Sequence, residues 1–168
     1  LPISYKVKKA AAAAERIFHV IDNETVIKED PNAININSFN DKIEIKNMSF
    51  SYDDENVLNN FNLSISKGKN IALVGQSGSG KSTIANLICR FYDVDSGSIN
   101  IDGENIKKLK KESLRELIGL VTQDSILFND SIKNNLLIAK PNATDDELID
   151  CLKIANAWEF VNKLPDGI

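Results

Sequence analysis

The stretch Gly75-Gln76-Ser77-Gly78-Ser79-Gly80-Lys81-Ser82-Thr83 decides how this chain folds. It fits the pattern G-x-x-x-x-G-K-[ST], which is typical of a phosphate-binding loop. The short apolar run Ile71–Val74 precedes it and predicts a strand buried on both faces of a parallel sheet. After the loop, apolar residues recur at helical spacing, namely Ile84, Leu87, Ile88 and Phe91. This order of strand, glycine loop and helix favours a nucleotide site over a glycine-rich turn that only caps a helix.

The residue types in the loop suit a bound anion. Its glycines can adopt positive φ angles and let the backbone close around a phosphate. The N–H groups of the loop and of the first helical turn then point inward, where the helix dipole favours negative charge. Lys81 is long enough to reach the outer phosphates, and the Ser82 hydroxyl can ligate Mg²⁺.

The composition indicates a globular protein of about one domain. The chain has 168 residues, of which 42% are hydrophobic and 26% are charged, and its net charge is −4. Nothing in this balance suggests a nucleic-acid surface, which usually carries a basic excess. A cluster of lysines is explained more simply by a solvated loop or helix face: Lys107, Lys108, Lys110 and Lys111.

Other features of the composition point to structural roles. Cys89 and Cys151 lie beside apolar residues in expected helices, so both are interpreted as small core residues in a reducing compartment. His19 has no potential ligand partner at metal-binding spacing and is interpreted as structural. The chain has no run of about 18 apolar residues, so no membrane span is predicted within it. The start also lacks the order of a signal peptide.

The first forty residues divide into a helix and a linker. A helix is expected from Ala10 to about Asp22, with one face made of Ala10, Ala13, Ala14, Ile17 and Ile21. This face packs either on something outside the chain or on its own domain. Residues 23–41 have linker composition, which places a domain boundary near Asp41.

A β layer is expected on either side of the phosphate loop. Residues 43–52 alternate with a phase shift at Asn47, which suggests a bulge. A polar turn is expected over 51–56, and residues 61–66 read as a half-buried strand that leads into a turn at 67–69. Beyond the loop helix, a turn at 95–98 and a strand at 98–102 are expected.

The remainder alternates short helices, a strand and loops. A helix is expected over 111–118, then a short apolar strand over 118–122 that ends at Gln123. Residues 125–128 form a loop with exposed apolar side chains, and residues 144–147 form a capping box that starts a helix. The inner face of that helix is expected to consist of Leu148, Cys151, Leu152 and Ala155.

In family order, these stretches resemble the nucleotide-binding domain of ATP-binding cassette (ABC) transporters, specifically exporters in which that domain is fused to a membrane domain. Residues 50–52 with Val57-Leu58 are similar to the aromatic loop, and residues 75–83 to the Walker A loop. Residues 118–132 are similar to the Q-loop region, and residues 143–167 to the beginning of the helical subdomain. Residues 12–22 resemble the connector that leaves the last membrane helix.

The resemblance implies roles for the matching residues. Tyr52 would stack on adenine, with a strand-end tyrosine in the core as the alternative. Ser82 and Gln123 would complete a Mg²⁺ shell, and Gln123 would also sense the attacking water. The implied ATP-binding residues are Tyr52, Gly75, Gln76, Ser77, Gly78, Ser79, Gly80, Lys81, Ser82, Thr83 and Gln123. The residues implied to face cytoplasmic loops of the membrane domain are Ser125, Ile126, Leu127 and Phe128.

The family pattern is incomplete. After Gln123 there is no LSGGQ-like segment and no run of four apolar residues followed by Asp-Glu, so the signature loop, the catalytic glutamate and the switch histidine are missing. The expected fold is therefore an α/β P-loop NTPase core of ABC type with an antiparallel β subdomain, truncated before the signature loop and the Walker B strand. Because the strands beside Ile71–Val74 would come from later sequence, the chain alone is expected to be marginally stable and to hydrolyse ATP poorly.

The implied organisation is a connector helix at 1–22, a linker at 23–41 and a partial nucleotide-binding domain at 42–168. The intact protein would hydrolyse ATP to export a substrate, together with a second nucleotide-binding domain and without nucleic acid. It would be membrane-associated, with this domain on the cytoplasmic or organelle-interior face. The alternatives are a soluble ABC-type ATPase and a non-hydrolysing nucleotide-binding fragment. A P-loop kinase would need an acceptor-binding motif, and none is recognisable.

Overall fold

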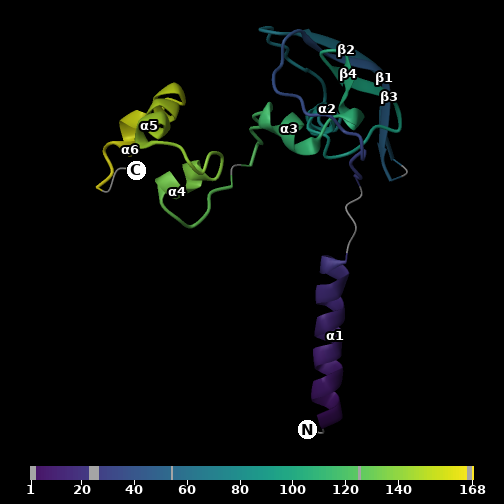
Figure 1. Cartoon of the computed structure of the whole chain (residues 1–168), viewed down its shortest axis with the longest axis vertical. Helices are drawn as coiled ribbons and strands as arrows, with labels where there is room; N and C mark the ends of the chain where they lie inside the picture. Colours follow the sequence, from purple (N-terminus) through teal and green to yellow (C-terminus); the bar gives the residue numbers. More distant parts are fainter. Residues whose placement is uncertain (1–2, 23–26, 54, 125, 166–167) are drawn as a thin grey trace. The chain divides into compact units, whose positions relative to one another are not determined.

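The computed structural model describes residues 3–22, 27–53, 55–124, 126–165 and 168. The chain forms two compact units, residues 1–119 and residues 120–168. Helix α1 (Ile3–Ile21) begins well before the expected start at Ala10, because no helix breaker follows Pro2 (Figure 1). The side chain of His19 lies outside the described part. None of the helices described is long and apolar enough to cross a membrane.

An antiparallel sheet is the main feature of the first unit. Its strands are β1 (Lys42–Tyr52), β2 (Glu55–Ser66), β3 (Ser96–Ile101) and β4 (Glu104–Asn105), in the spatial order β2-β1-β3-β4. The expected turn over 51–56 is too long, since β1 and β2 pair as far as Tyr52 and Glu55. The expected turn at 95–98 is also partly wrong, because β3 already begins at Ser96.

The expected bulge at Asn47 is confirmed. The register between β1 and β2 shifts between Ile45 and Met48, and Asn47 has a φ of 47°. The Asn62 side-chain oxygen accepts a hydrogen bond from the Asn47 backbone N–H at 2.9 Å. On the other side of β1, Gly97 lies so close to the Asn47 carbonyl that a Cβ atom at this position would collide with it. The bulge therefore requires glycine in the neighbouring strand β3.

Helix α2 (Lys81–Ile88) packs on this sheet and closes the core. Ile84 and Leu87 are buried as expected, whereas Phe91 lies beyond the helix end and is exposed. A 3₁₀ turn η1 (Ile106–Lys108) and helix α3 (Lys111–Glu116) follow β4, and α3 confirms the helix expected over 111–118. The core cluster consists of Ile45, Met48, Phe50, Leu58, Ile84, Leu87, Val94, Ile99, Ile101, Ile106, Leu109 and Leu114.

The second unit contains three short helices, α4 (Ile132–Leu137), α5 (Asp145–Ile154) and α6 (Trp158–Val161). The capping box is confirmed: the Thr144 hydroxyl accepts from the Glu147 N–H, and the Glu147 carboxylate accepts from the Thr144 N–H. The expected inner face of α5 is half right. Leu148 and Leu152 are buried, whereas Cys151 and Ala155 are exposed.

The interpretation of the two cysteines as core residues is right for Cys89 and wrong for Cys151. Cys89 is buried at the end of α2. Burial raises the pKa of its thiol, and the nearby positive charge of Arg115 opposes that shift only in part.

The two strands expected over the apolar runs at 71–74 and 118–122 are not formed. Residues 71–74 and 118–122 have no strand ladder, and Val74 and Val121 are 90% and 92% exposed. A strand needs a neighbour for its backbone N–H and C=O groups, and no strand in the described residues pairs with either run. The apolar composition identified segments suited to burial, but the burial itself requires partner strands.

Candidate phosphate-binding site

The glycine loop leads directly into α2 and shapes its N-terminus. Gly78 and Gly80 both have a φ of 81°, the left-handed conformation that side chains disfavour. Gly80 is the N-cap of α2, and no side chain caps this helix end. The Gly80 carbonyl accepts from the Ile84 N–H at 3.0 Å. The N–H groups of the first turn are therefore available to a ligand, as at other anion-binding helix ends.

Close packing against β2 fixes the position of Gly80. A Cβ atom added to Gly80 would lie 2.9 Å from Leu58 Cδ2 and 3.1 Å from Val57 Cγ1. The hairpin β1–β2 therefore touches the start of α2 through Val57 and Leu58. This contact connects the strand after the aromatic residues to the glycine loop.

The Lys81 side chain turns back into the loop. Its Nζ donates to the carbonyls of Gly75 and Gln76 at 3.0 and 2.6 Å, and to the Ser79 hydroxyl at 3.2 Å. The ammonium group thus lies within a ring of loop oxygens, close to where the loop would surround a phosphate. Ser82 is exposed at the next position, and Thr83 is buried beneath the loop. The donor set, backbone amides with one ammonium and one free hydroxyl, fits a phosphate and a metal ion bound to it.

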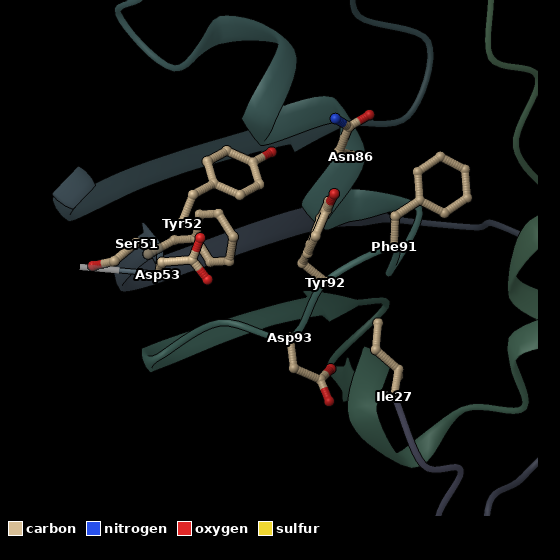
Figure 2. A pocket seen from close by; sticks show the side chains of 9 residues that line it. Ile27, Ser51, Tyr52, Asp53, Asn86, Phe91, Tyr92 and Asp93 are labelled. Atoms are coloured by element: carbon tan, nitrogen blue, oxygen red, sulfur yellow. The ribbon is translucent and has the colours of Figure 1, made fainter. Parts of the chain in front are cut away.

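Tyr52 lies in an aromatic cluster at the end of β1. Its ring centroid is 4.8 Å from that of Phe50 and 5.1 Å from that of Tyr92, both in edge-on geometry. Tyr52 is half-buried and lines a cavity of about 800 Å³, together with Asn86 from α2 (Figure 2). The residues that line this cavity do not include any from the glycine loop. The structure therefore brings Tyr52 to the C-terminal half of α2 but shows no contact with Lys81.

Tyr92 and Asn86 also line this cavity, and neither was among the residues expected to bind nucleotide. Tyr92 follows Phe91 immediately, and that aromatic pair directly after the loop helix was a usable signal. Asn86 could not be found in this way, because it is one of several polar residues of α2 and has no distinctive pattern.

Gln123 belongs to the second unit. It is exposed, in a loop where the Thr122 hydroxyl donates to the Asp124 carbonyl at 2.7 Å. Of the residues expected to face a partner, Ile126 and Leu127 are more than 80% exposed and Phe128 is also exposed. Ser125 lies outside the described residues. The Asn135 side chain donates to the Phe128 carbonyl and accepts from its N–H, which holds the end of this loop.

A glycine loop at the N-terminus of a core helix, with a lysine folded into it, defines a P-loop nucleotide-binding protein. The family model described as "ABC transporter" matches residues 58–166. This chain belongs to the ABC transporter family, and its fold is an α/β P-loop core of ABC type with an antiparallel β subdomain.

Individual relatives agree with the family model. The chain is 43% identical over 165 residues to an "ATP-dependent lipid A-core flippase" of Syntrophus aciditrophicus (strain SB), in a match that covers 98% of this chain and 28% of that protein. It is 47% identical over 163 residues to "ABC transporter B family member 1" of Arabidopsis thaliana, covering 95% of this chain and 13% of that protein.

Among solved structures, "Structure of a bacterial Atm1-family ABC exporter with ATP bound" matches with a TM-score of 0.87 and 35% identity. That match covers 96% of this chain and 28% of the exporter chain. The chain thus spans between 13% and 28% of the length of these relatives.

Proposed function

We propose that this chain binds ATP at residues 75–83 and that, in the whole protein, ATP hydrolysis powers export of a substrate across a membrane. The observation that carries the proposal is the loop geometry: the N-terminus of α2 has no side-chain cap, and the Lys81 ammonium is folded back onto the carbonyls of the loop that precedes it. The relatives' names support the export step, since they include a flippase and an exporter with ATP bound.

The residues divide the work by chemistry. The amides of the loop and of the first turn of α2 would hold the phosphate oxygens, and Lys81 would leave its loop carbonyls to neutralise the outer phosphates. Ser82 and Gln123 would ligate Mg²⁺, which supplies charge neutralisation between the phosphates. Tyr52 would stack on adenine, a contact that aromatic residues make at about 1–3 kcal/mol per base in single-stranded nucleic-acid sites.

We propose that efficient hydrolysis needs groups in addition to those recognised in these 168 residues. No carboxylate follows a four-residue apolar run after Gln123, so the chain has no recognisable general base for water. We infer that a second nucleotide-binding domain closes the site, and that the chain alone hydrolyses ATP poorly. Exposed Ile126, Leu127 and Phe128 suit a contact with loops of a membrane domain, since three neighbouring apolar side chains otherwise face water. We propose that this domain lies at the cytoplasmic or organelle-interior face of a membrane.

Calorimetric titration with Mg²⁺-ATP tests the nucleotide site. We expect Lys81→Ala to weaken ATP binding at least tenfold, because it removes the positive charge that faces the phosphates. Lys69→Ala is the matched control, since it removes an exposed lysine of the same unit outside the loop. Thermal unfolding gives a second measurement: ATP at 100 times its dissociation constant stabilises the fold by about 2.7 kcal/mol. Equal ATP affinity of Lys81→Ala and the wild type would contradict the proposal.

A further inference from the structure

Residues 27–36, interpreted above as linker, lie along the first unit as a strap. At one end, the Lys111 ammonium donates to the Ile27 carbonyl at 2.9 Å. The Glu29 carboxylate accepts from the Lys111 backbone N–H at 2.8 Å, at the first residue of α3. A linker that only connected α1 to the sheet would not need both of these hydrogen bonds to Lys111.

The other end of the strap pairs with the segment before α3. The Ile34 N–H donates to the Lys108 carbonyl, and the Ile34 carbonyl accepts from the Lys110 N–H, each at 2.9 Å. The Ile36 N–H donates to the Ser113 hydroxyl at 3.2 Å. The strap is therefore fixed to the folded unit at both ends.

Arg90 joins this strap to the end of α2. Its side chain is only 2% exposed, and its φ of 51° places it in a left-handed turn just after the helix. One guanidinium nitrogen donates to the Lys28 carbonyl at 3.3 Å, and another donates to the carbonyls of Ile106 and Leu109 at 3.2 Å each. The remaining nitrogen pairs with Asp93 at 3.1 Å. Only an arginine fork supplies donors in so many directions from one buried site.

Helix α2 connects Arg90 to the phosphate loop. The helix begins at Lys81 and ends at Ile88, and the Arg90 N–H donates to the Leu87 carbonyl at 3.0 Å. An anion at the N-terminus of a helix stabilises it through the aligned peptide dipoles. Because a helix of two turns is marginal by itself and forms cooperatively, stabilising its first turn also reduces opening of its last turn.

We propose that Arg90 is a positioning residue that couples the phosphate loop to the strap, so that ATP at the loop reduces local opening of residues 27–36. The inference rests on the proposed ATP site. If the coupling holds, residues 27–36 do more than connect α1 to the nucleotide-binding unit. They are a part of that unit, and their local opening responds to nucleotide.

Hydrogen exchange of the full-length protein, with and without Mg²⁺-ATP, tests the coupling. The reporter is the peptide that covers residues 27–36, whose Ala33 and Ile34 amides are hydrogen-bonded. In the wild type, ATP is expected to slow exchange of these amides by about threefold to tenfold. Arg90→Lys, which keeps the charge and loses the fork, is expected to abolish that change while ATP affinity stays within about threefold.

Arg115→Lys is the matched control. Arg115 donates to the carbonyls of Cys89 and Arg90 at the same helix end, and its hydrogen bonds do not reach the strap. It is therefore expected to keep the ATP-dependent change. A wild-type strap that does not respond to bound ATP would overturn the inference whether or not Arg90→Lys folds. A response retained in Arg90→Lys, or lost equally in Arg115→Lys, would also overturn it. Failure of the wild type to bind ATP would overturn the proposed function as well, and the titration distinguishes that result.

Discussion

Gly78 and Gly80 share a left-handed backbone but differ in their surroundings. A Cβ atom on Gly78 would meet nothing within 4 Å, whereas one on Gly80 would press on Leu58 and Val57. A side chain at Gly78 would therefore meet only backbone strain, whereas a side chain at Gly80 would also collide with residues of β2.

Alanine substitutions at these glycines test that difference. Gly78→Ala is expected to cost about 1 kcal/mol of unfolding free energy, the strain of a left-handed alanine. Gly80→Ala adds overpacking and is expected to cost about 2–4 kcal/mol in total. Urea unfolding of both variants measures the difference. Equal losses would show that contact with β2 does not restrict Gly80.

Asp102 holds the start of β1 at the turn after β3. Its carboxylate accepts from the backbone N–H groups of Asn40, Asp41 and Lys42 at 2.6, 2.8 and 3.0 Å. Partial burial acts to raise the pKa of Asp102. The three donors and the charge of Lys67 outweigh burial and hold this pKa below its ordinary value of 3.8.

The depressed pKa predicts how stability depends on pH. A carboxylate with a lower pKa in the folded state contributes stability above its unfolded pKa, and this contribution is lost as pH falls through the folded pKa. We expect Asp102→Asn to be less stable than the wild type at neutral pH and the two to converge below about pH 4. Urea unfolding at several pH values measures this. Glu104→Gln, at the first residue of β4 and outside this cap, is the control, and a constant difference across pH would refute the assignment.

At the scale of elements, local signals are strongest at helix ends. The capping box of α5 satisfies two backbone N–H groups reciprocally, and the Lys140 ammonium adds a 2.6 Å contact to Glu147. Hydrogen bonds from Lys140, from the Thr144 N–H and from its hydroxyl lower the pKa of Glu147. The start of this helix therefore depends mainly on residues 140–147, which are close in sequence.

Loss of the cap is expected to destabilise α5 locally. Thr144→Ala removes the hydroxyl that accepts from the Glu147 N–H and is expected to cost about 1 kcal/mol. Thr144→Ser keeps an acceptor and is expected to stay near the wild type. Hydrogen exchange at the Glu147 amide, compared among the three proteins, reads out the effect directly. Equal exchange in Thr144→Ala and Thr144→Ser would show that the cap is not stabilising.

At the scale of the whole molecule, apolar side chains divide into a core and an exposed set. Leu87 is fully buried between α2 and the sheet, whereas Ile71 and Val74 are 44% and 90% exposed beside the phosphate loop. The first set stabilises this chain. The second is suited to neighbouring strands, and none of the strands described pairs with it.

Paired substitutions distinguish the two sets. Leu87→Ala is expected to cost about 2–5 kcal/mol of unfolding free energy, because it leaves a cavity in the core. Val74→Ala is expected to change it by less than about 0.5 kcal/mol, because the side chain already faces water. Urea denaturation of the 168-residue chain measures both. A large loss for Val74→Ala would show that residues 71–74 are buried against a strand in solution.

Several local features of this protein could be predicted from short stretches of sequence. The glycine loop, the helical spacing of α2 and the capping box at Thr144 each depend on residues close in sequence, whose backbone preferences act locally. The bulge at Asn47 is visible in the local pattern but also needs Gly97 in the neighbouring strand β3. The position of Lys81 within the loop follows from the same short stretch.

Other features depend on contacts between residues far apart in the sequence and could be seen only in the folded chain. The runs at 71–74 and 118–122 have strand composition but remain unpaired, because a strand exists only beside another strand. The strap at 27–36 has linker composition but is fixed, because Arg90, Lys111 and Ser113 supply its hydrogen-bond partners from more than sixty positions away in the sequence. The local sequence pattern indicates which conformation a segment favours. Whether the segment adopts that conformation depends on whether the fold brings a hydrogen-bonding or packing partner beside it.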